Sequence, residues 1–358
     1  MSIASATSMG ATVMRPCRRY PYPVHDPPSE DAITISRPRL ATRSVESFAD
    51  GFEAVAQNVA TVIQGKDEPI RLALVCLLAE GHLLIEDVPG VGKTSLAKAL
   101  AASLGCTWGR IQFTPDLLPS DVTGVTVYNR ATGTFEFRPG GIFANLVLGD
   151  EINRASPKTQ SALLEAMEER QVTVDRTTYP LPTPFMVIAT QNPVEHEGTY
   201  PLPESQLDRF LMRIEMGYPG RASEIAILDT HALGPQSLHL DPVASEADVM
   251  VMIELAHAIH VAQSLKGYIV DIAEATRRRS DLALGVSPRA ALGLLRAARA
   301  RAAAMGREYV VPDDIKTLAG PVLEHRLALT PEAQLRGANR QDVLADVLAS
   351  VPVPTRSA

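Results

Sequence analysis

Hydrophobic residues recur at two different spacings along the chain, and these spacings predict its elements. From residue 45 onward, short apolar runs alternate with segments in which apolar residues return every three or four positions. Short runs are typical of buried strands, and the longer spacing is typical of helices. The expected strands are 82–86, 111–113, 146–148 and 185–189. Strands that alternate with helices predict a parallel sheet covered on both faces.

Two pairs of short segments interrupt this pattern and predict β-hairpins. Residues 125–128 and 134–137 flank a polar turn, and residues 171–174 and 178–181 repeat the arrangement further along. After about residue 218 the strand pattern ends, and helical spacing follows at 222–230, 246–262, 269–278, 288–304 and 312–327.

These patterns predict three parts. Residues 1–44 are rich in Pro, Ser, Thr and Arg and show no period, so we expect a disordered tail. Residues 45–218 are expected to form an α/β domain that carries both hairpins. Residues 219–352 are expected to form a smaller all-helical domain.

Composition narrows the class of protein. The net charge of −7 argues against a nucleic-acid binder that works by neutralising phosphates. The three cysteines are odd in number and show no C-x-x-C spacing, so neither a disulfide framework nor a zinc site is expected. Charged residues interrupt every apolar run, and the N-terminus has no continuous apolar segment. We therefore expect a cytoplasmic protein without membrane insertion or a secretory signal.

A glycine-rich loop follows the strand at 82–86 and opens a helix. Its sequence, Val-Pro-Gly-Val-Gly-Lys-Thr at 88–94, is typical of loops whose backbone N–H groups surround a phosphate. Lys93 is expected to reach the β- and γ-phosphates of ATP, and the Thr94 hydroxyl to bind Mg²⁺. Asp87 stands where the full motif has its first glycine. A glycine-rich turn with a solvated lysine is the alternative, which the preceding buried strand disfavours.

Two polar groups follow later strands. The apolar run at 145–149 ends in Asp150 and Glu151, and at the carboxyl edge of a parallel sheet these would face the phosphate loop. Asp150 would hold Mg²⁺ through water and Glu151 would polarise the attacking water. Alone, such a run more often ends in solvent. Asn192 follows the strand at 185–189 and would orient that water, or would form a turn before Pro193.

Three arginines are candidates for stabilising the charge that develops during hydrolysis. Arg209 could be supplied from a neighbouring subunit, or could form a surface ion pair with Asp208 or Glu204. Arg289 falls in the first turn of a helix that begins at 287–288, where a cation opposes the helix dipole. Arg154, just after the acidic pair, is a further candidate.

Six motifs occur in the order typical of the MoxR family of AAA+ ATPases, which this sequence resembles over about residues 45–350. They are Gly-Val-Gly-Lys-Thr, Gly-Asp-Glu-Ile-Asn-Arg-Ala, Ala-Thr-Gln-Asn-Pro, Glu-Gly-Thr-Tyr-Pro-Leu-Pro-Glu, Leu-Asp-Arg-Phe and Val-Ser-Pro-Arg-Ala. The resemblance implies a P-loop AAA+ core with a parallel sheet flanked by helices, plus a smaller all-α lid domain.

The same resemblance assigns roles to residues. It places Lys93 in Walker A, Glu151 in Walker B, Asn192 at sensor 1, Arg209 at the trans arginine finger and Arg289 at sensor 2, with Thr94 and Asp150 as metal ligands. It makes the two hairpins the helix-2 and pre-sensor-1 inserts. It also implies a nucleotide pocket lined by Val62, Ile63, Pro89, Gly90, Val91, Gly92, Lys93, Thr94 and Ser95.

Beyond the site, the resemblance implies a hexameric ring that works as a chaperone-like remodeller or maturation factor. A partner with a von Willebrand factor A domain and a protein client are expected, and ATP·Mg²⁺ is expected to bind between the α/β domain and the lid. Four alternatives stay open: a subunit of the magnesium-chelatase type, a nucleic-acid motor or transcription activator, a small-molecule kinase, and a scaffold without activity. The acidic charge disfavours the nucleic-acid motor, and the helical C-terminal half disfavours the kinase.

Overall fold

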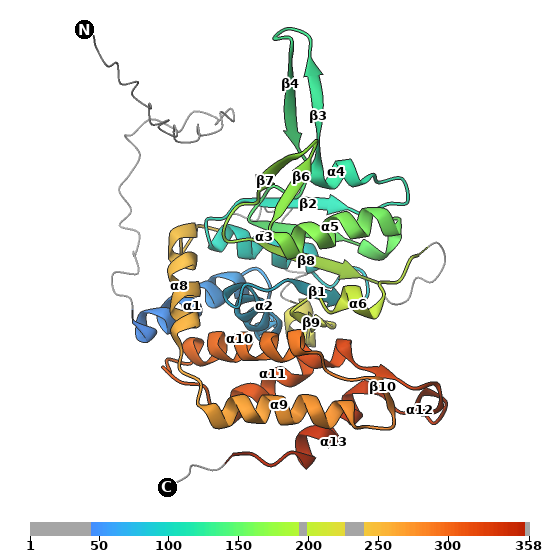
Figure 1. Cartoon of the computed structure of the whole chain (residues 1–358). Helices are drawn as coiled ribbons and strands as arrows, with labels where there is room; N and C mark the ends of the chain where they lie inside the picture. Colours follow the sequence, from blue (N-terminus) through green and yellow to red (C-terminus); the bar gives the residue numbers. More distant parts are fainter. Residues whose placement is uncertain (1–43, 193–198, 226–239, 355–358) are drawn as a thin grey trace, which may run out of the picture. The chain divides into compact units, whose positions relative to one another are not determined.

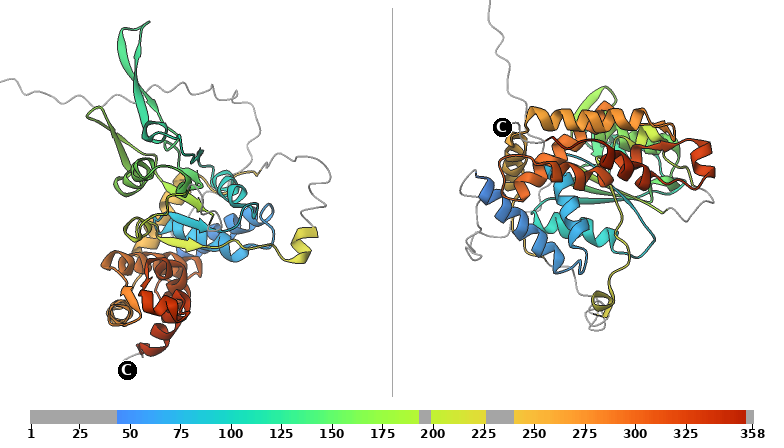
Figure 2. Two further views of the ribbon diagram at one scale, coloured as in Figure 1. Left: turned by 90° about the vertical axis from the view of Figure 1, so that its right-hand side faces the viewer. Right: turned by 90° about the horizontal axis from the view of Figure 1, so that it is seen from below.

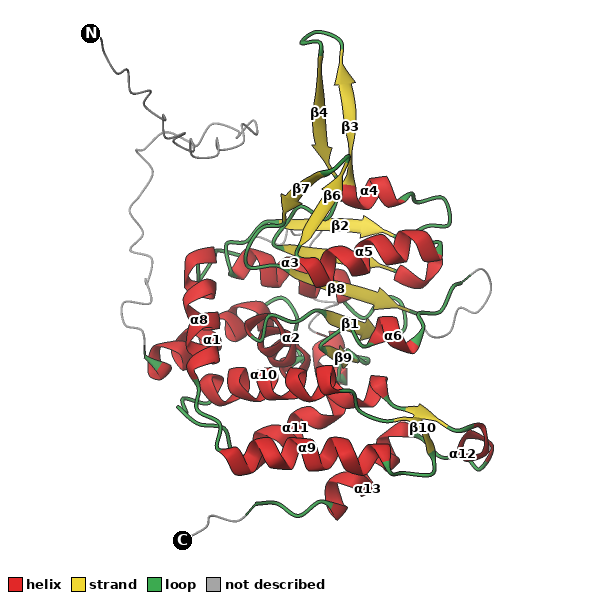
Figure 3. Cartoon of the chain, in the orientation of Figure 1, coloured by secondary structure: helices red, strands yellow, loops and turns green. Residues whose placement is uncertain are grey.

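The computed structural model describes residues 44–192, 199–225 and 240–354. The predicted tail therefore lies outside the described residues, apart from Ser44. Of the helix expected at 222–230, residues 222–225 are helical and the rest also lies outside. Figures 1 and 3 show the elements of the described chain.

A five-stranded sheet forms the centre of the α/β part, with strand order β2–β5–β8–β1–β9. Every neighbouring pair is parallel, so all the strands end at one edge. We call this the carboxyl edge, and the opposite one the amino edge. The strands are β1 (Leu83–Glu86), β2 (Trp108–Gln112), β5 (Leu146–Asp150), β8 (Met186–Gln191) and β9 (Met212–Ile214). The four expected strands are confirmed, and β9 is an addition.

Side chains alternate between the two faces of this sheet, and both faces are buried. Leu83 and Ile85 belong to the core cluster that also contains α1, α2 and α3, whereas Leu84 belongs to the cluster beneath α5. The helices of this part are α1 (Val45–Ala60), α2 (Asp67–Leu78), α3 (Lys93–Ser103), α4 (Pro119–Thr123), η1 (Ile152–Arg154), α5 (Pro157–Glu169) and α6 (Glu204–Leu207). The prediction of a parallel sheet flanked by helices is thus confirmed.

Both predicted hairpins are present. The first pairs β3 (Gly124–Asn129) with β4 (Thr134–Pro139), and the second pairs β6 (Gln171–Val174) with β7 (Thr177–Pro180). The first stands out from the sheet in Figure 1 and in the left-hand view of Figure 2. The rings of Tyr128 and Phe135 lie 5.2 Å apart near its end, and the Phe135 side chain is 74% exposed. Phe137 stacks on Tyr179, which joins the two hairpins at their bases.

The chain after residue 240 is mainly helical, which confirms the helical lid. Its elements are α8 (Glu246–Ala258), α9 (Gln263–Arg277), α10 (Pro288–Ala304), α11 (Pro312–Leu323), η2 (Glu324–Arg326), α12 (Pro331–Leu335) and α13 (Arg340–Ser350). Ser287 caps α10 as predicted, because its hydroxyl accepts from the N–H of Ala290 at 3.1 Å.

One feature of the lid differs from the prediction of a purely helical domain. β10 (Leu282–Leu284) and β11 (Ala328–Leu329) form a small antiparallel pair. Strands of two or three residues hold too few positions to show an alternating pattern, so the sequence did not reveal them. The hydrophobic core runs without a break from the sheet into the lid helices, and the boundary near residue 219 stays a prediction. None of the described helices is long and apolar enough to cross a bilayer.

Candidate functional site

The loop between β1 and α3 has a backbone suited to an anion. Gly90 and Gly92 have φ angles of 85° and 94°, in the left-handed region that favours glycine. A Cβ at either position would meet no atom within 4 Å, so conformation and not crowding requires glycine here. Gly92 caps α3, which brings the positive end of the helix dipole directly after the loop.

Asp87 replaces the first glycine of the motif, and its side chain ties the loop to a distant segment. Its Oδ2 accepts hydrogen bonds from the backbone N–H groups of Met216 at 2.7 Å and Gly217 at 2.6 Å. The buried Lys66 donates to the carbonyls of residues 216, 217 and 218 at 2.7, 2.8 and 2.7 Å. Asp87 thus fixes the start of the loop against the chain that leads toward the lid. Sequence reasoning missed this contact because the partners are 129 and 130 residues away.

Lys93 lies between the ends of β1 and β8. Its Nζ donates to the carbonyl of Asp87 at 2.6 Å and to that of Gln191 at 3.4 Å. Burial lowers the pKa of Lys93, and the carboxylates of Asp87, Asp150 and Glu151 oppose that shift. Lys93 reaches the end of β8 at Gln191, and Thr190 of the same strand bonds to Asp150, so the lysine and the acidic pair lie at the same carboxyl edge.

The acidic pair is held by a threonine on the neighbouring strand. The Thr190 hydroxyl donates to Asp150 Oδ1 at 2.7 Å and accepts from the N–H of Glu151 at 2.9 Å. Glu151 has a φ of 57°, which is uncommon for a residue other than glycine. The chain therefore turns sharply directly after β5, at the second residue of the acidic pair.

Three further polar side chains surround these acids. The Arg110 guanidinium donates to Asp150 Oδ2 at 2.7 Å, and Gln112 donates to Glu151 Oε2 at 3.0 Å. Arg154, a candidate from sequence, pairs with Glu151 at 3.1 Å. Sequence reasoning missed Arg110 and Gln112: the strand expected at 111–113 begins at Trp108 in the structure, and its pairing with β5 was not predicted. Their partners depend on the register, in which Gln112 lies opposite Asp150.

The other nucleotide-binding candidates also lie close to this edge. Thr94 and Ser95 are half-buried in the first turn of α3, and Asn192 is buried directly after β8. Ile63 lies in the same core cluster as Val91 of the loop, and Val62 packs against that cluster. Thr94 and Ser95 follow the loop directly, and the roles of all these residues stay predictions.

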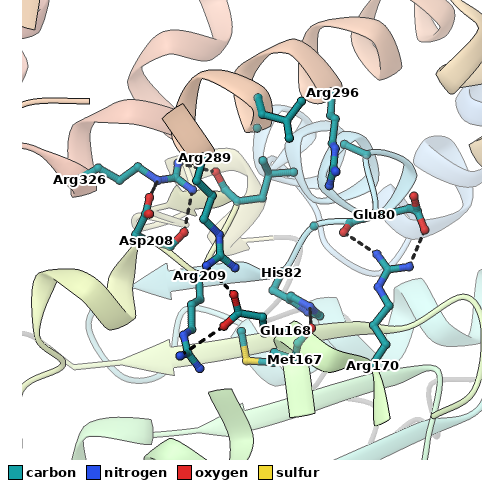
Figure 4. Close-up of a pocket in the computed structure, with 15 residues that line it drawn as sticks. Glu80, His82, Met167, Glu168, Arg170, Asp208, Arg209, Arg289, Arg296 and Arg326 are labelled. Atoms are coloured by element: carbon teal, nitrogen blue, oxygen red, sulfur yellow. Dashed lines mark hydrogen bonds and ion pairs between the residues drawn. The ribbon is translucent and has the colours of Figure 1, made fainter. Parts of the chain in front are cut away.

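A second polar site lies at the amino edge, in a pocket of about 400 Å³ (Figure 4). Arg209, at the end of α6, and Arg289, in the first turn of α10, both pair with Glu168 of α5. The Arg209 Nη2–Glu168 Oε2 distance is 3.3 Å, and Arg289 Nη1 lies 2.9 Å from Oε1. Arg209 therefore pairs with neither Asp208 nor Glu204.

This pocket and the phosphate loop lie at opposite edges of the sheet. Residues 79–82, which precede β1, line the pocket, whereas the phosphate loop follows β1. Arg289 thus lies beside Arg209 and away from Lys93 of its own chain. Binding of ATP·Mg²⁺ between the α/β part and the lid stays a prediction, and so does the sensor-2 role of Arg289. The α10 helix begins over the amino edge, which sequence could not reveal.

Two other arginines of the pocket, Arg326 and Arg170, are already paired. Arg326, which is buried, donates from Nε to Asp208 Oδ1 at 2.6 Å, and burial lowers its pKa. Arg170 donates to Glu80 Oε1 at 2.5 Å. Arg296 of α10 also lines the pocket. Burial would raise the pKa of Glu80, but the positive charges of Arg170, His257 and Arg296 lower it overall.

His82 forms part of the floor of the pocket as a neutral side chain. Its Nδ1 accepts from the N–H of Val187 at 3.0 Å, so Nε2 carries the proton and donates to the carbonyl of Met167 at 3.0 Å. Burial lowers the pKa of His82 to about 4. The hydrogen bond to Met167 opposes this shift, and the positive charges of Arg170 and Arg289 add to it. His82 is therefore a structural link between β1, β8 and α5.

Two family models and several relatives match this chain. Residues 82–212 match the model of the ATPase family associated with various cellular activities, and residues 274–347 match an AAA lid domain. The chain is similar to the uncharacterized protein YeaC of Bacillus subtilis, with 50% identity over 84% of this chain and 94% of the relative. It is also similar to the chaperone MoxR1 of Mycobacterium tuberculosis, with 42% identity over 83% of this chain and 81% of the relative.

A solved structure agrees with these relatives. The crystal structure of a candidate ATPase from Cytophaga hutchinsonii is 39% identical and superposes with a TM-score of 0.82. It covers 87% of this chain, and the match includes 97% of that structure. The similarity therefore extends over both the sheet and the lid.

Proposed function

Because this chain belongs to the MoxR family of AAA+ ATPases, we propose that it binds and hydrolyses ATP and uses the cycle to remodel other proteins. The observation that carries this proposal is the meeting of three groups at one edge of the sheet. Lys93 begins α3 and reaches the end of β8 at Gln191. Thr190 of the same strand holds Asp150, which Glu151 follows at the end of β5. Each chemical task in hydrolysis thus has a group at this edge.

The loop and its lysine bind the phosphates in this proposal. Backbone N–H groups around Gly90 and Gly92 and the start of α3 surround the phosphate oxygens, and Lys93 exchanges its two carbonyl partners for the terminal phosphates. Val62 and Ile63 line the adenine pocket. The hydrogen bonds of Asp87 to the N–H groups of residues 216 and 217 hold the start of the loop in place.

The residues present fit a magnesium ion. Thr94 and Asp150 supply oxygen ligands on the same side as Lys93, and Mg²⁺ is usually held by one or two such groups together with substrate phosphates. The Arg110 guanidinium that pairs with Asp150 is 46% exposed, so it can move aside. The ion would neutralise phosphate charge as it develops.

Glu151 is the general base of the proposed reaction. Its carboxylate polarises the attacking water, and Asn192 orients that water from the end of β8. Gln112 and Arg154 hold Glu151 by one oxygen, Oε2, at 3.0 and 3.1 Å. The other oxygen then accepts the proton.

We propose that the site is completed by a neighbouring subunit. Arg209 and Arg289 lie together at the edge opposite the phosphate loop, and their side chains are 30% and 46% exposed. Guanidinium groups in this position are open to the nucleotide of another chain, where they would stabilise the transition state. A closed ring of such contacts gives each chain one complete site, and a hexamer is the expected form.

The remodelling step is assigned to the hairpins. The β3–β4 hairpin stands away from the sheet and exposes Tyr128 and Phe135, which suits contact with an apolar segment of a client (Figure 2). A partner with a von Willebrand factor A domain is the proposed adaptor, on the basis of the family alone.

Hydrolysis by the purified chain tests the proposal. The wild type is expected to hydrolyse ATP when Mg²⁺ is present. Glu151→Gln should lose activity by at least about 100-fold and still bind a fluorescent ATP analogue, because the loop is intact. A wild type that binds no nucleotide, or a Glu151→Gln protein with the normal rate, would show that the proposal is wrong.

A further inference from the structure

One carboxylate joins the two arginines of the amino edge. Glu168 lies in the last turn of α5, and each of its oxygens faces a different guanidinium, Oε1 toward Arg289 and Oε2 toward Arg209 (Figure 4). The two arginines come from separate parts of the chain, since Arg209 precedes β9 and Arg289 begins a lid helix. Glu168 is thus the point at which the α/β part and the lid bring their cations together.

The other acids that line this pocket have different partners. Asp208 accepts from Arg326 and from the Ser287 hydroxyl. Glu80 accepts from Arg170 and faces His257 at 3.1 Å. Glu168 is therefore the lining carboxylate that contacts Arg209 and Arg289 in the described chain.

We propose that Glu168 is a positioning residue for catalysis in the neighbouring subunit. It sets Arg209 and Arg289 side by side so that both guanidiniums address the same phosphate. This inference rests on the proposed function, because it needs the two arginines to act on another chain's nucleotide. Glu168 itself touches neither nucleotide nor water in this scheme.

Charge supports a positioning role. Arg209, Arg289 and Arg296 all line the pocket, and like charges that share a pocket repel one another. Among the described residues, Glu168 is the side chain that links Arg289 of the lid to Arg209 of the α/β part, so its loss would leave the two guanidiniums unconnected. The two would separate, and a displacement of about 1 Å at a reacting centre can lower a rate by about 100-fold.

Glu168→Gln removes the charge and one acceptor oxygen while it preserves size. We expect kcat for ATP to fall by about 10- to 100-fold. The KM for ATP should stay within about twofold, because the phosphate loop lies at the other edge of the sheet. Glu165→Gln is the matched control, since it lies one turn earlier on α5 and lines a different pocket. It should keep the wild-type rate.

Mixed rings separate positioning across the interface from a defect within one subunit. A Glu151→Gln subunit has an inactive site of its own but supplies intact arginines to its neighbour. Mixed with Glu168→Gln before ATP is added, it should restore hydrolysis several-fold above the mean of the two separate proteins. A Glu168→Gln subunit that is merely misfolded, or impaired in its own site, gains nothing from such a neighbour.

A reference mixture distinguishes the failure of this inference from that of the proposed function. Arg209→Ala with Glu151→Gln tests the trans arginine alone. If that mixture recovers activity and the Glu168→Gln mixture does not, the role of Glu168 is wrong and the trans site stands. If neither recovers, the trans site fails and the inference with it. A Glu168→Gln protein with an unchanged or raised kcat would also overturn the inference.

Discussion

The two edges of the central sheet hold their functional residues in different ways. At the carboxyl edge, Lys93 donates to backbone carbonyls, and a threonine one strand away fixes Asp150. At the amino edge, side chains pair with side chains across long stretches of sequence, and Arg289 and Glu168 are 121 residues apart. The carboxyl edge is therefore set mainly by the strands themselves. The amino edge depends on how the lid packs against them.

This contrast bears on how the protein can be controlled. A site whose parts follow directly from the strands is present in every folded subunit. A pair of arginines that needs the lid in place, and that we propose serves another chain, should respond to lid position and to assembly. Changes at the carboxyl edge should therefore affect a subunit's own nucleotide, and changes at the amino edge should affect its neighbour's.

The largest effect is expected from Arg209→Ala. Loss of an arginine finger removes transition-state stabilisation, so kcat should fall by about 1,000-fold with nucleotide affinity unchanged. Steady-state ATPase rates and binding of a fluorescent ATP analogue measure the two quantities. Arg278→Ala, at an exposed arginine directly after α9, is the control and should keep the wild-type rate. A normal kcat in Arg209→Ala would contradict the proposal that the amino edge contributes to hydrolysis.

Asp208→Ala should produce the next largest effect, on stability. It leaves the Arg326 guanidinium buried without its carboxylate, and such a loss costs about 3–5 kcal/mol. Glu80→Ala is the comparison at the same edge, because its partner Arg170 is 37% exposed and the cost should be about 1 kcal/mol or less. Urea unfolding gives both free energies. Equal losses in the free energy of unfolding would show that burial does not make the Asp208–Arg326 pair more important for stability than the Glu80–Arg170 pair.

The pH dependence of stability tests His82. Its pKa of about 4 in the folded chain lies below the ordinary value of about 6.5, so the unfolded chain binds a proton that the folded chain does not. The contribution is fully present above pH 6.5 and is lost as the pH falls toward 4. By pH 5 the loss should be about 2 kcal/mol. His82→Gln should show a smaller fall in the free energy of unfolding between pH 7 and pH 5, and an identical fall would contradict this assignment.

Asp87→Ala should have the smallest effect of the four, at the carboxyl edge. It removes the acceptor for the N–H groups of Met216 and Gly217, which should lower the free energy of unfolding by about 1–2 kcal/mol. ATP affinity should also fall, because the start of the loop is released. Asp67→Ala, at the exposed start of α2, is the control for affinity. Unchanged affinity in Asp87→Ala would mean that the tie serves stability alone.

Sequence predicted the sheet and the phosphate loop because their signals are local. An apolar run followed by Gly-Val-Gly-Lys-Thr specifies a strand, a turn and a helix start within a few residues, and the structure has β1 and α3 in those places. The cap at Ser287 was equally readable from its neighbour Pro288. β9 was missed because three residues at the sheet's edge give no periodic pattern.

The amino edge was not predictable for a different reason. Arg209 and Arg289 were recognised as candidates, but their shared partner Glu168 lies in a helix with no distinguishing pattern. Only the tertiary fold brings these three residues together. The same holds for Asp87, where the departure from the motif was visible and its partners were not.

The most direct test of the divided site is the ATPase rate per subunit across a range of protein concentrations, with molar mass followed by light scattering in ATP and Mg²⁺. If each nucleotide needs arginines from a second chain, the rate per subunit should rise steeply as the mass moves from monomer toward hexamer, and level off once the ring is complete. A monomer that hydrolyses ATP at the same rate per subunit at every concentration would contradict the account.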